Sequence, residues 1–312
     1  MPAKTGYFVL SARPGATVRG RVEVTNTGSA GAVALYAVDG TTGKTTGAVY
    51  RSRQERRVDV GRWIKLTPSR VTVPAGKMTL VTFRVRIPAH ASRGQHLGGI
   101  VAEPLSPVAR RSTTHGKHSF QVRIKELAVV AVEVKLPGPL FQRMAITSIG
   151  AATQSGRQTL ELGLANTGDA LLKGKGSLVV SRASGRRVLS QAFKLDTFVP
   201  RTQIAYPLAV ATRALPAGDY RGTVKLTYGR GHHLIRTLRF SIGSKQLAHL
   251  SHANRPPPAA SGSHNDLLLI LSGVGLVLLG VVASATYFKA QGRKAALASP
   301  TASGDAQAGT ER

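Results

Sequence analysis

The sequence contains no cysteine in its 312 residues. This absence excludes disulfide cross-links and thiolate chemistry, so any folded domain must be stabilised by its hydrophobic core alone. Aromatic residues are also scarce, at 5% with a single tryptophan, whereas Val, Thr, Gly and Ala are plentiful. This composition favours strands and turns over helical bundles. We therefore expect β-rich domains without covalent cross-links.

Acidic residues are few, with 14 Asp and Glu against 43 Lys and Arg, and the formal net charge is +29. The basic residues occur throughout the chain rather than in one tail. A field of this sign attracts polyanions, although a solvated surface in an Arg-rich protein is the alternative interpretation. Nucleic acid is not expected as a partner, because the sequence has no recognition helix and no row of stacking aromatics.

Catalytic and metal-binding motifs are missing as well. The sequence has no H-E-x-x-H, no G-x-S-x-G, no phosphate-binding loop and no G-x-G-x-x-G. Carboxylates are too sparse to offer an obvious catalytic pair, and Asp59 is expected to be a turn or cap residue. Paired histidines fall in predicted loops, a hairpin turn and a linker, without acidic or Cys neighbours; these are His115 and His118, His232 and His233, and His249 and His252. We therefore expect no enzyme activity, no cofactor and no metal.

Alternating hydrophobic and polar residues predict half-buried strands. Val22 and Val24 share one face of residues 16–25, while Arg19 and Arg21 share the other. Residues 77–87 alternate in the same way. Further extended stretches are predicted at 32–38, 58–66 and 119–136, with a turn at 39–40 and loops at 41–57 and 104–117.

The strand pattern occurs twice along the chain. A strand leads into Asn26-Thr27-Gly28, and another leads into Asn166-Thr167-Gly168, about 140 residues later. Short strands spaced roughly 8–12 residues apart are typical of β-sandwiches. Residues 137–139, Pro-Gly-Pro, mark the predicted boundary between the copies. The predicted fold is all-β: two tandem immunoglobulin-like β-sandwich domains, residues 1–136 and 137–243, followed by one C-terminal transmembrane helix.

That helix is predicted at residues 267–288, an uncharged apolar stretch long enough to cross a hydrocarbon core of about 30 Å. Asp266 precedes it, and Lys289, Arg293 and Lys294 follow it. The basic residues after the span favour a cytoplasmic C-terminus. Residues 244–266 form a predicted Pro-rich linker, and residues 289–312 a short basic, then disordered, cytoplasmic tail.

The best candidate for ligand binding is a basic cluster with neighbouring aromatics. Guanidinium groups bind phosphate or carboxylate, and aromatic faces bind sugar rings, so this cluster suits an anionic glycan. Its members are Tyr50, Arg51, Arg53, Arg56, Arg57, Arg62 and Trp63. A solvated loop is an equally good interpretation of the arginines, and burial in a sandwich core is the preferred interpretation of Trp63.

An ordered set of short motifs covers most of residues 6–135. The motifs are Tyr7–Leu10, Arg13–Gly15, Val24–Gly28, Gly61–Leu66, Val73–Gly76, Phe83–Pro88 and Gly94–Ile100. Together they resemble the N-terminal domain of WxL-interacting proteins, which are Gram-positive cell-surface proteins. The resemblance implies a peptidoglycan-binding Ig-like domain, a second Ig-like domain linked to host or matrix binding, a membrane helix and a basic cytoplasmic end. Residues 140–243 match the second family domain only in layout.

We therefore expect a membrane-anchored cell-surface protein that attaches to peptidoglycan or an anionic wall polymer and docks WxL-type surface proteins. An Ig-like assembly or chaperone module for exported proteins is the alternative. Met1–Leu10 does not read as a secretory signal, so we expect the start codon to be assigned downstream of the true one. A tail-anchored protein with cytoplasmic domains is the literal alternative.

Overall fold

The computed structural model describes residues 7–106, 109–115, 118–124, 126–210 and 214–244. The predicted linker beyond Ser244, the span at 267–288, its flanking residues Asp266, Lys289, Arg293 and Lys294, and the tail lie outside the described residues. Within the described part of the chain, no helix is long and apolar enough to cross a bilayer.

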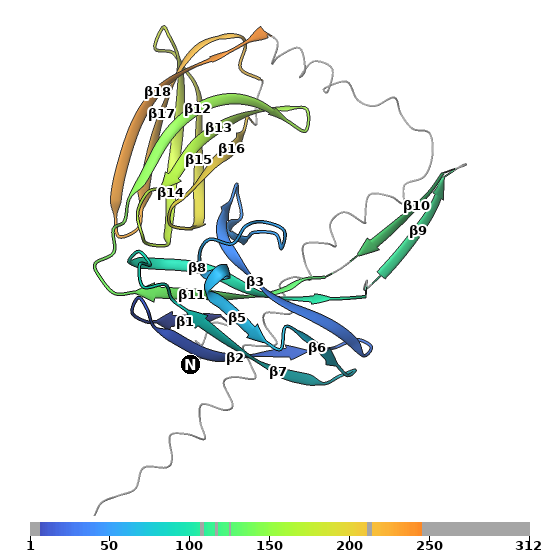
Figure 1. The fold of residues 1–312 in the computed structure, drawn as a ribbon. Coiled ribbons are helices and arrows are strands. Elements are labelled where there is room, and N and C mark those ends of the chain that lie inside the picture. The colour runs from blue at the N-terminus through green and yellow to red at the C-terminus, as the bar shows by residue number, and fades with distance from the viewer. Residues whose placement is uncertain (1–6, 107–108, 116–117, 125, 211–213, 245–312) are drawn as a thin grey trace, which may run out of the picture. The chain divides into compact units, whose positions relative to one another are not determined.

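A six-stranded sheet and a three-stranded sheet form the N-terminal sandwich (Figure 1). The larger sheet has the order β1-β11-β8-β3-β4, with β6 also paired to β3, and the smaller has the order β2-β7-β5. The bounds are β1 Phe8–Ser11, β2 Thr17–Thr25, β3 Gly31–Gly43, β4 Gly47–Tyr50, α1 Val60–Trp63, β5 Ile64–Thr67, β6 Arg70–Val73, β7 Met78–Arg86, β8 Gly94–Pro104 and β11 Ala128–Leu136. Strand β1 runs parallel to β11, and the other pairs are antiparallel.

The inward faces of these two sheets share one hydrophobic core. Val81, Phe83 and Val85 of β7 are almost fully buried, as the alternation predicted. From the larger sheet, Ile100 of β8 and Val132 of β11 pack into the same cluster. The intervening residues of β7 are exposed, so the outer face of the small sheet is solvated.

The C-terminal sandwich consists of a three-stranded sheet, β12-β13-β16, and a four-stranded sheet, β15-β14-β17-β18. Its strands are β12 Met144–Gln154, β13 Arg157–Asn166, β14 Leu172–Arg182, β15 Arg187–Phe198, β16 Thr202–Ala209, β17 Gly218–Tyr228 and β18 His232–Ile242. Leu160, Leu162 and Leu164 of β13 are fully buried and pack with Leu178 and Val224 of the other sheet. The prediction of an all-β fold is confirmed.

The two Asn-Thr-Gly sequences form the same local structure. The side-chain oxygen of Asn26 accepts the Gly28 N–H at 3.0 Å, and that of Asn166 accepts the Gly168 N–H at 3.1 Å. Each Asn side-chain amide also donates to two backbone carbonyls, one of them on a distant segment. Each asparagine therefore stabilises the turn after its strand by hydrogen bonds to the turn and to a distant segment. This shared role explains why the Asn-Thr-Gly sequence occurs in both sandwiches.

Several local predictions were wrong. Strand β3 continues through Asp39 and Gly40 because Asp39 lies opposite Gly98 in the ladder and its carboxylate is buried. The predicted loop at 41–57 contains the end of β3 and all of β4, and residues 60–63 of the expected extended stretch form α1. The predicted loop at 104–117 contributes to a hairpin of β9 (Ala109–His115) and β10 (His118–Ile124), which interrupts the long extended run.

Candidate polyanion-binding site

The arginine-rich segment 51–59 and the following α1 are fixed to the sheet by one buried carboxylate. Asp39 on β3 is 2% exposed and accepts backbone N–H bonds from Val58, Asp59 and Gly61, the last at 2.7 Å. Hydrogen bonds to a charged acceptor are stronger than those between neutral groups. Asp39 therefore anchors the segment at the point where it turns into α1.

A second polar contact fixes the same turn from β8. The His96 Nδ1 lies 2.8 Å from Asp59 Oδ1, and its Nε2 lies 2.8 Å from the Ser92 carbonyl oxygen. The His96 ring also lies 4.8 Å from the Trp63 ring, between centroids. Asp59 occupies the N-cap position of α1, but its carboxylate bonds to His96 instead of capping the helix.

Gly61 permits the close approach of α1 to β3. A Cβ at this position would lie 2.5 Å from the Val38 carbonyl carbon and 2.6 Å from the Asp39 nitrogen. Such distances exclude any side chain without movement of the backbone. The inner side of α1 packs against β3 through Gly61. The neighbouring Arg62 side chain lies on the outer side of α1 and is exposed.

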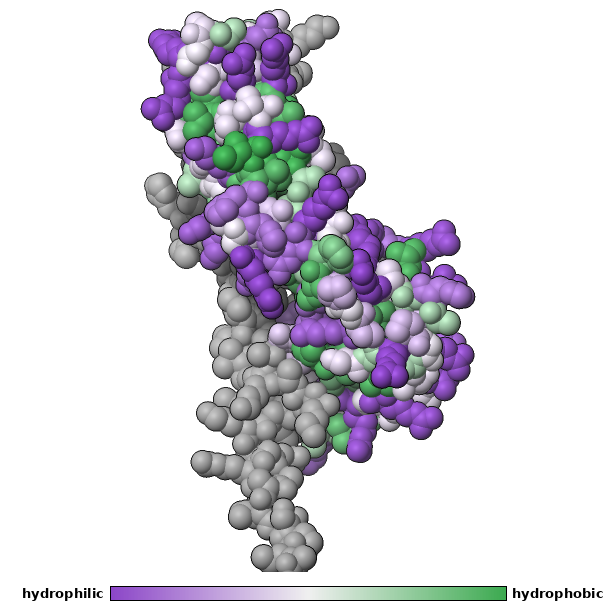
Figure 2. Space-filling model, turned by 90° about the vertical axis from the view of Figure 1, so that its left-hand side faces the viewer, coloured by the Kyte–Doolittle hydropathy of each residue, from purple (hydrophilic) through white to green (hydrophobic). Residues whose placement is uncertain are grey.

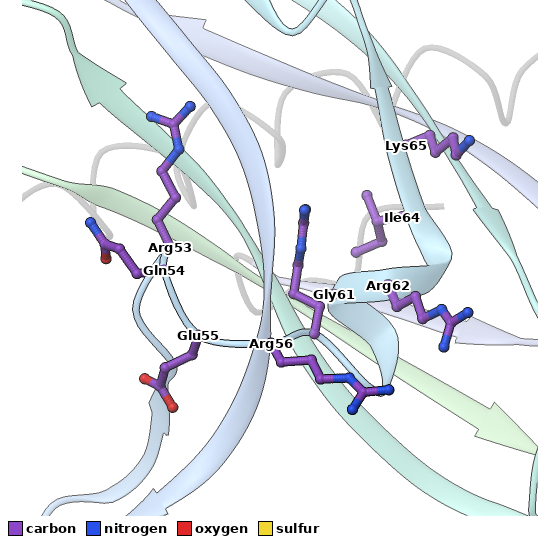
Figure 3. Close-up of a pocket in the computed structure, with 9 residues that line it drawn as sticks. Arg53, Gln54, Glu55, Arg56, Gly61, Arg62, Ile64 and Lys65 are labelled. Carbon is purple, nitrogen blue, oxygen red and sulfur yellow. The ribbon is translucent and has the colours of Figure 1, made fainter.

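A hollow of about 620 Å³ lies beside this turn (Figure 3). Its lining combines five cationic side chains with a single carboxylate; the residues are Arg53, Gln54, Glu55, Arg56, Arg57, Gly61, Arg62, Ile64 and Lys65. Figure 3 shows the Arg56 and Arg62 side chains extending toward the same side, whereas Arg53 extends away from them. A second hollow, of about 390 Å³, shares Arg53, Arg57 and Lys65 with the first.

Some of the arginines are already engaged by acidic groups. Arg51 pairs with Glu55 at 2.8 Å, and Arg53 pairs with Glu103 at 3.1 Å while lying 4.6 Å over the Tyr36 ring. The Ser52 backbone N–H, and then the Arg51 guanidinium, hold the pKa of Glu55 below its ordinary value. Burial, and then the Glu103 charge, raises the pKa of Tyr36.

The remaining cations of the hollow have no acidic partner among the residues that the structure describes. Arg56, Arg62 and Lys65 form no ion pair with any residue that the structure describes. Their side chains are exposed, and Arg57 makes only a long 3.5 Å contact to the Ala37 carbonyl oxygen. Cationic side chains without internal partners are available to an external anion.

Comparison with known protein families finds a similarity in this region. Residues 1–103 match the family described as "WxL Interacting Protein, peptidoglycan binding domain". The N-terminal part of the chain, about a third of its length, is therefore similar to this family. The match confirms the resemblance seen in the motifs, and it includes every residue that lines the two hollows.

Other comparisons are distant. No curated protein gives a significant match. Solved structures with some similarity include the CsuC–CsuE chaperone–tip adhesion subunit complex of Acinetobacter baumannii, at 12% identity over 75% of this chain and 94% of that chain, with a TM-score of 0.35. The E. coli chaperone DraB is 14% identical over 76% of this chain and 94% of that chain, with a TM-score of 0.32. At these TM-scores the similarity identifies neither function nor partner.

Within the N-terminal sandwich, the structure brings together only part of the predicted site. Arg53, Arg56, Arg57 and Arg62 line the hollow, whereas Arg51 is turned to Glu55. Five lining residues were not predicted as part of the site: Gln54, Glu55, Gly61, Ile64 and Lys65. Lys65 could have been found from its place in the alternation of residues 64–67, which puts it on the outer face beside Arg62.

Both predicted aromatics lie away from the hollow. Trp63 is 7% exposed and belongs to the core cluster, in agreement with the preferred interpretation. The Tyr50 ring packs against β8 at Gly99, where a Cβ would come within 2.8 Å of it, and burial raises the pKa of its phenol. Neither predicted aromatic therefore offers a ring to a sugar in the first hollow, whereas the Tyr36 ring lines the second hollow beneath Arg53.

No group of three or more metal-ligating side chains occurs among the residues whose side chains are described. His115 and His118 are opposite one another in the β9–β10 hairpin, where only the backbone is described. His249 and His252 lie outside the described residues. Nothing in the described site therefore points to a resident metal.

Proposed function

We propose that this chain is a cell-surface protein that attaches to the bacterial cell wall through its N-terminal domain, by binding rather than catalysis. The observation that carries the proposal is the group of unpaired cations Arg56, Arg62 and Lys65, held on a rigid turn within a domain of the peptidoglycan-binding family. Cell walls offer carboxylates and phosphates, which are the anions that guanidinium and ammonium groups bind.

The rigidity of the turn supports this proposal. Asp39 and His96 fix α1 from two different strands, and Gly61 lets it lie directly on β3. The backbone that carries Arg56, Arg57 and Arg62 is therefore ordered before a ligand arrives. A binding surface that is already ordered loses less conformational entropy on association.

The overall organisation is part of the same proposal. Residues 1–136 and 137–243 would be Ig-like domains outside the cell, residues 244–266 a spacer, residues 267–288 a membrane helix and residues 289–312 a cytoplasmic tail. Docking of WxL-type surface proteins is a further expectation. Protease treatment of intact cells tests this topology: digestion of the two sandwiches agrees with it, and protection of both contradicts it.

Sedimentation with purified wall sacculi tests the binding proposal. The full-length chain in detergent would be compared with a variant carrying Arg56→Gln, Arg62→Gln and Lys65→Gln. A matched control removes three exposed cations from the C-terminal sandwich, with Arg187→Gln, Arg221→Gln and Lys225→Gln. We expect weakened binding by the first variant only; equal binding by all three proteins would contradict the proposal.

A further inference from the structure

The outer face of the small sheet carries a row of cations that the site described above does not include. Strand β7 lies between β2 and β5, and in the ladder Arg84 of β7 is opposite Arg19 of β2 on one side and Lys65 of β5 on the other. All three side chains are exposed. Directly opposed residues of antiparallel strands project from the same face, about 5 Å apart.

Two more arginines extend this row into a patch. Arg86 lies two residues beyond Arg84 on β7, and Arg21 lies two residues beyond Arg19 on β2, so both project from the same face. We call these five residues (Arg19, Arg21, Lys65, Arg84 and Arg86) the basic face. None of the five pairs with an acidic group among the described residues.

Acidic residues hardly offset this charge locally. Glu23 is the one acidic residue on these three fully described strands, and it lies opposite Leu80, beyond the cationic row. Its carboxylate accepts a hydrogen bond from the Thr25 hydroxyl at 3.1 Å. Like charges directly opposite one another destabilise strand pairing, so the row lowers the stability of the sheet. An external anion would remove this repulsion.

Lys65 joins the basic face to the arginine-rich hollow. It lines both hollows together with Arg53 and Arg57, and it is also one end of the row that crosses to Arg84 and Arg19. The cations therefore continue from the 51–65 segment across all three strands. Hydrophilic side chains cover much of the visible surface of the described residues, with hydrophobic patches between them (Figure 2).

The geometry of the basic face selects the kind of anion. Strands lie about 4.8 Å apart, and alternate residues along a strand are about 6.7 Å apart, so the charges form a flat array with regular spacing. A flat array without an enclosing cavity cannot surround a small ion, but it can contact an extended chain at several repeats. No exposed aromatic occurs on these strands to stack with a sugar ring.

We propose that the basic face binds a linear, phosphodiester-linked wall polymer, which runs from the arginine-rich hollow across β5, β7 and β2. This inference rests on the proposed wall binding and names its ligand class. Guanidinium groups bind phosphate oxygens in a bidentate manner, and one charge per repeat matches an array of separate cations. The glycan strand itself is then a secondary contact.

The test compares sacculi that retain their phosphodiester polymers with sacculi stripped of them by hydrofluoric acid. The full-length chain in detergent would be tested beside a basic-face variant, Arg19→Gln, Arg84→Gln and Arg86→Gln, and the C-terminal control variant described above. If each exposed ionic contact contributes about 0.5 kcal/mol, losing three weakens binding roughly tenfold. We expect that loss on untreated sacculi, and weak binding of every protein to stripped sacculi.

Soluble probes separate this inference from the proposed function. Synthetic poly(glycerol phosphate) should bind the unaltered chain and bind the basic-face variant about tenfold more weakly. If stripped and untreated sacculi bind equally and the variant is unaffected, wall binding stands and the phosphodiester assignment is overturned. Binding to poly(glycerol phosphate) without binding to sacculi would overturn the proposed function and leave the ligand class supported. Preference for anionic lipid vesicles over the polymer would overturn the ligand class.

Folding of the basic-face variant provides an internal check. Because the substitutions remove opposed like charges, its thermal unfolding temperature should equal or exceed that of the unaltered chain. Reduced binding with undiminished stability then reports on the ligand contact itself. A lower unfolding temperature would show that the row is a structural element, and this would count against the proposal.

Discussion

Replacing Asp39 by Asn should destabilise the N-terminal sandwich selectively. The Asp39 carboxylate is 2% exposed and accepts backbone N–H groups from Val58, Asp59 and Gly61. The amide of Asn keeps one acceptor oxygen but directs an NH₂ group toward N–H donors that already need an acceptor. Each bond to a charged acceptor contributes about 1.5–3 kcal/mol, so losing one or two of them costs roughly 2–4 kcal/mol.

Tryptophan fluorescence during urea unfolding measures this effect in one sandwich alone. Trp63 is the sole tryptophan, and it lies in the N-terminal core beside His96. The free energy of unfolding of Asp39→Asn would be compared with that of Glu23→Gln, which changes a partly exposed carboxylate on β2 of the same sandwich. A loss below about 1 kcal/mol for Asp39→Asn would refute the reasoning, because it would mean that the carboxylate is not the anchor of α1.

Three further outcomes are expected. Gly61→Ala places a Cβ against the β3 backbone and should cost about 1–3 kcal/mol or more by fluorescence-monitored unfolding. Gly31→Ala on β3 of the same sandwich, where the nearest atom lies 3.8 Å from the added Cβ, should cost far less, and equal effects would contradict the packing argument. Measured by calorimetry, Asn166→Ala should lower the free energy of unfolding by roughly 2–3 kcal/mol, because the Asn166 side chain is 1% exposed and its hydrogen bonds are buried. Asn26→Ala should lower it by less, and the reverse order would be inconsistent with the burial of Asn166. Because the folded-state pKa of Glu55 is depressed, its pairing with Arg51 should persist above the ordinary Glu pKa and be lost as the pH falls through the depressed value. The NMR shift of the Ser52 amide, which donates to Glu55, should titrate at that depressed value. Titration at the ordinary Glu pKa would contradict this prediction.

The sequence predicted those parts of the fold where one face of a strand is buried. Alternation located the buried residues of β2 and β7 correctly, since burial on one face imposes a period of two. The paired Asn-Thr-Gly turns predicted the repeat because each Asn side chain fastens its turn through local hydrogen bonds.

The errors arose where tertiary contacts override local signals. Asp39-Gly40 is a strong turn sequence, but the Asp39 side chain serves a segment about twenty residues further along the chain. The α1 turn is only four residues long, and it exists because Asp39 and His96 fix it to two strands. Neither contact can be read from the neighbouring residues.

The candidate site was predicted in part for a similar reason. Charge density in the sequence identified Arg53, Arg56, Arg57 and Arg62. The row formed by Arg19, Lys65 and Arg84 depends on strand register, which brings together residues that are up to about 65 positions apart. A search for charge clusters along the sequence therefore missed this row. The alternation within each strand nevertheless shows that each of the three side chains faces outward.

The salt dependence of binding to wall sacculi tests the central claim most directly. Binding of the full-length chain should weaken steadily with increasing sodium chloride, and the Arg56→Gln, Arg62→Gln, Lys65→Gln variant should show both weaker binding and a shallower salt dependence, because fewer charges contact the polymer. The C-terminal control variant should follow the unaltered chain. Salt-independent binding, or identical curves for all three proteins, would contradict the account.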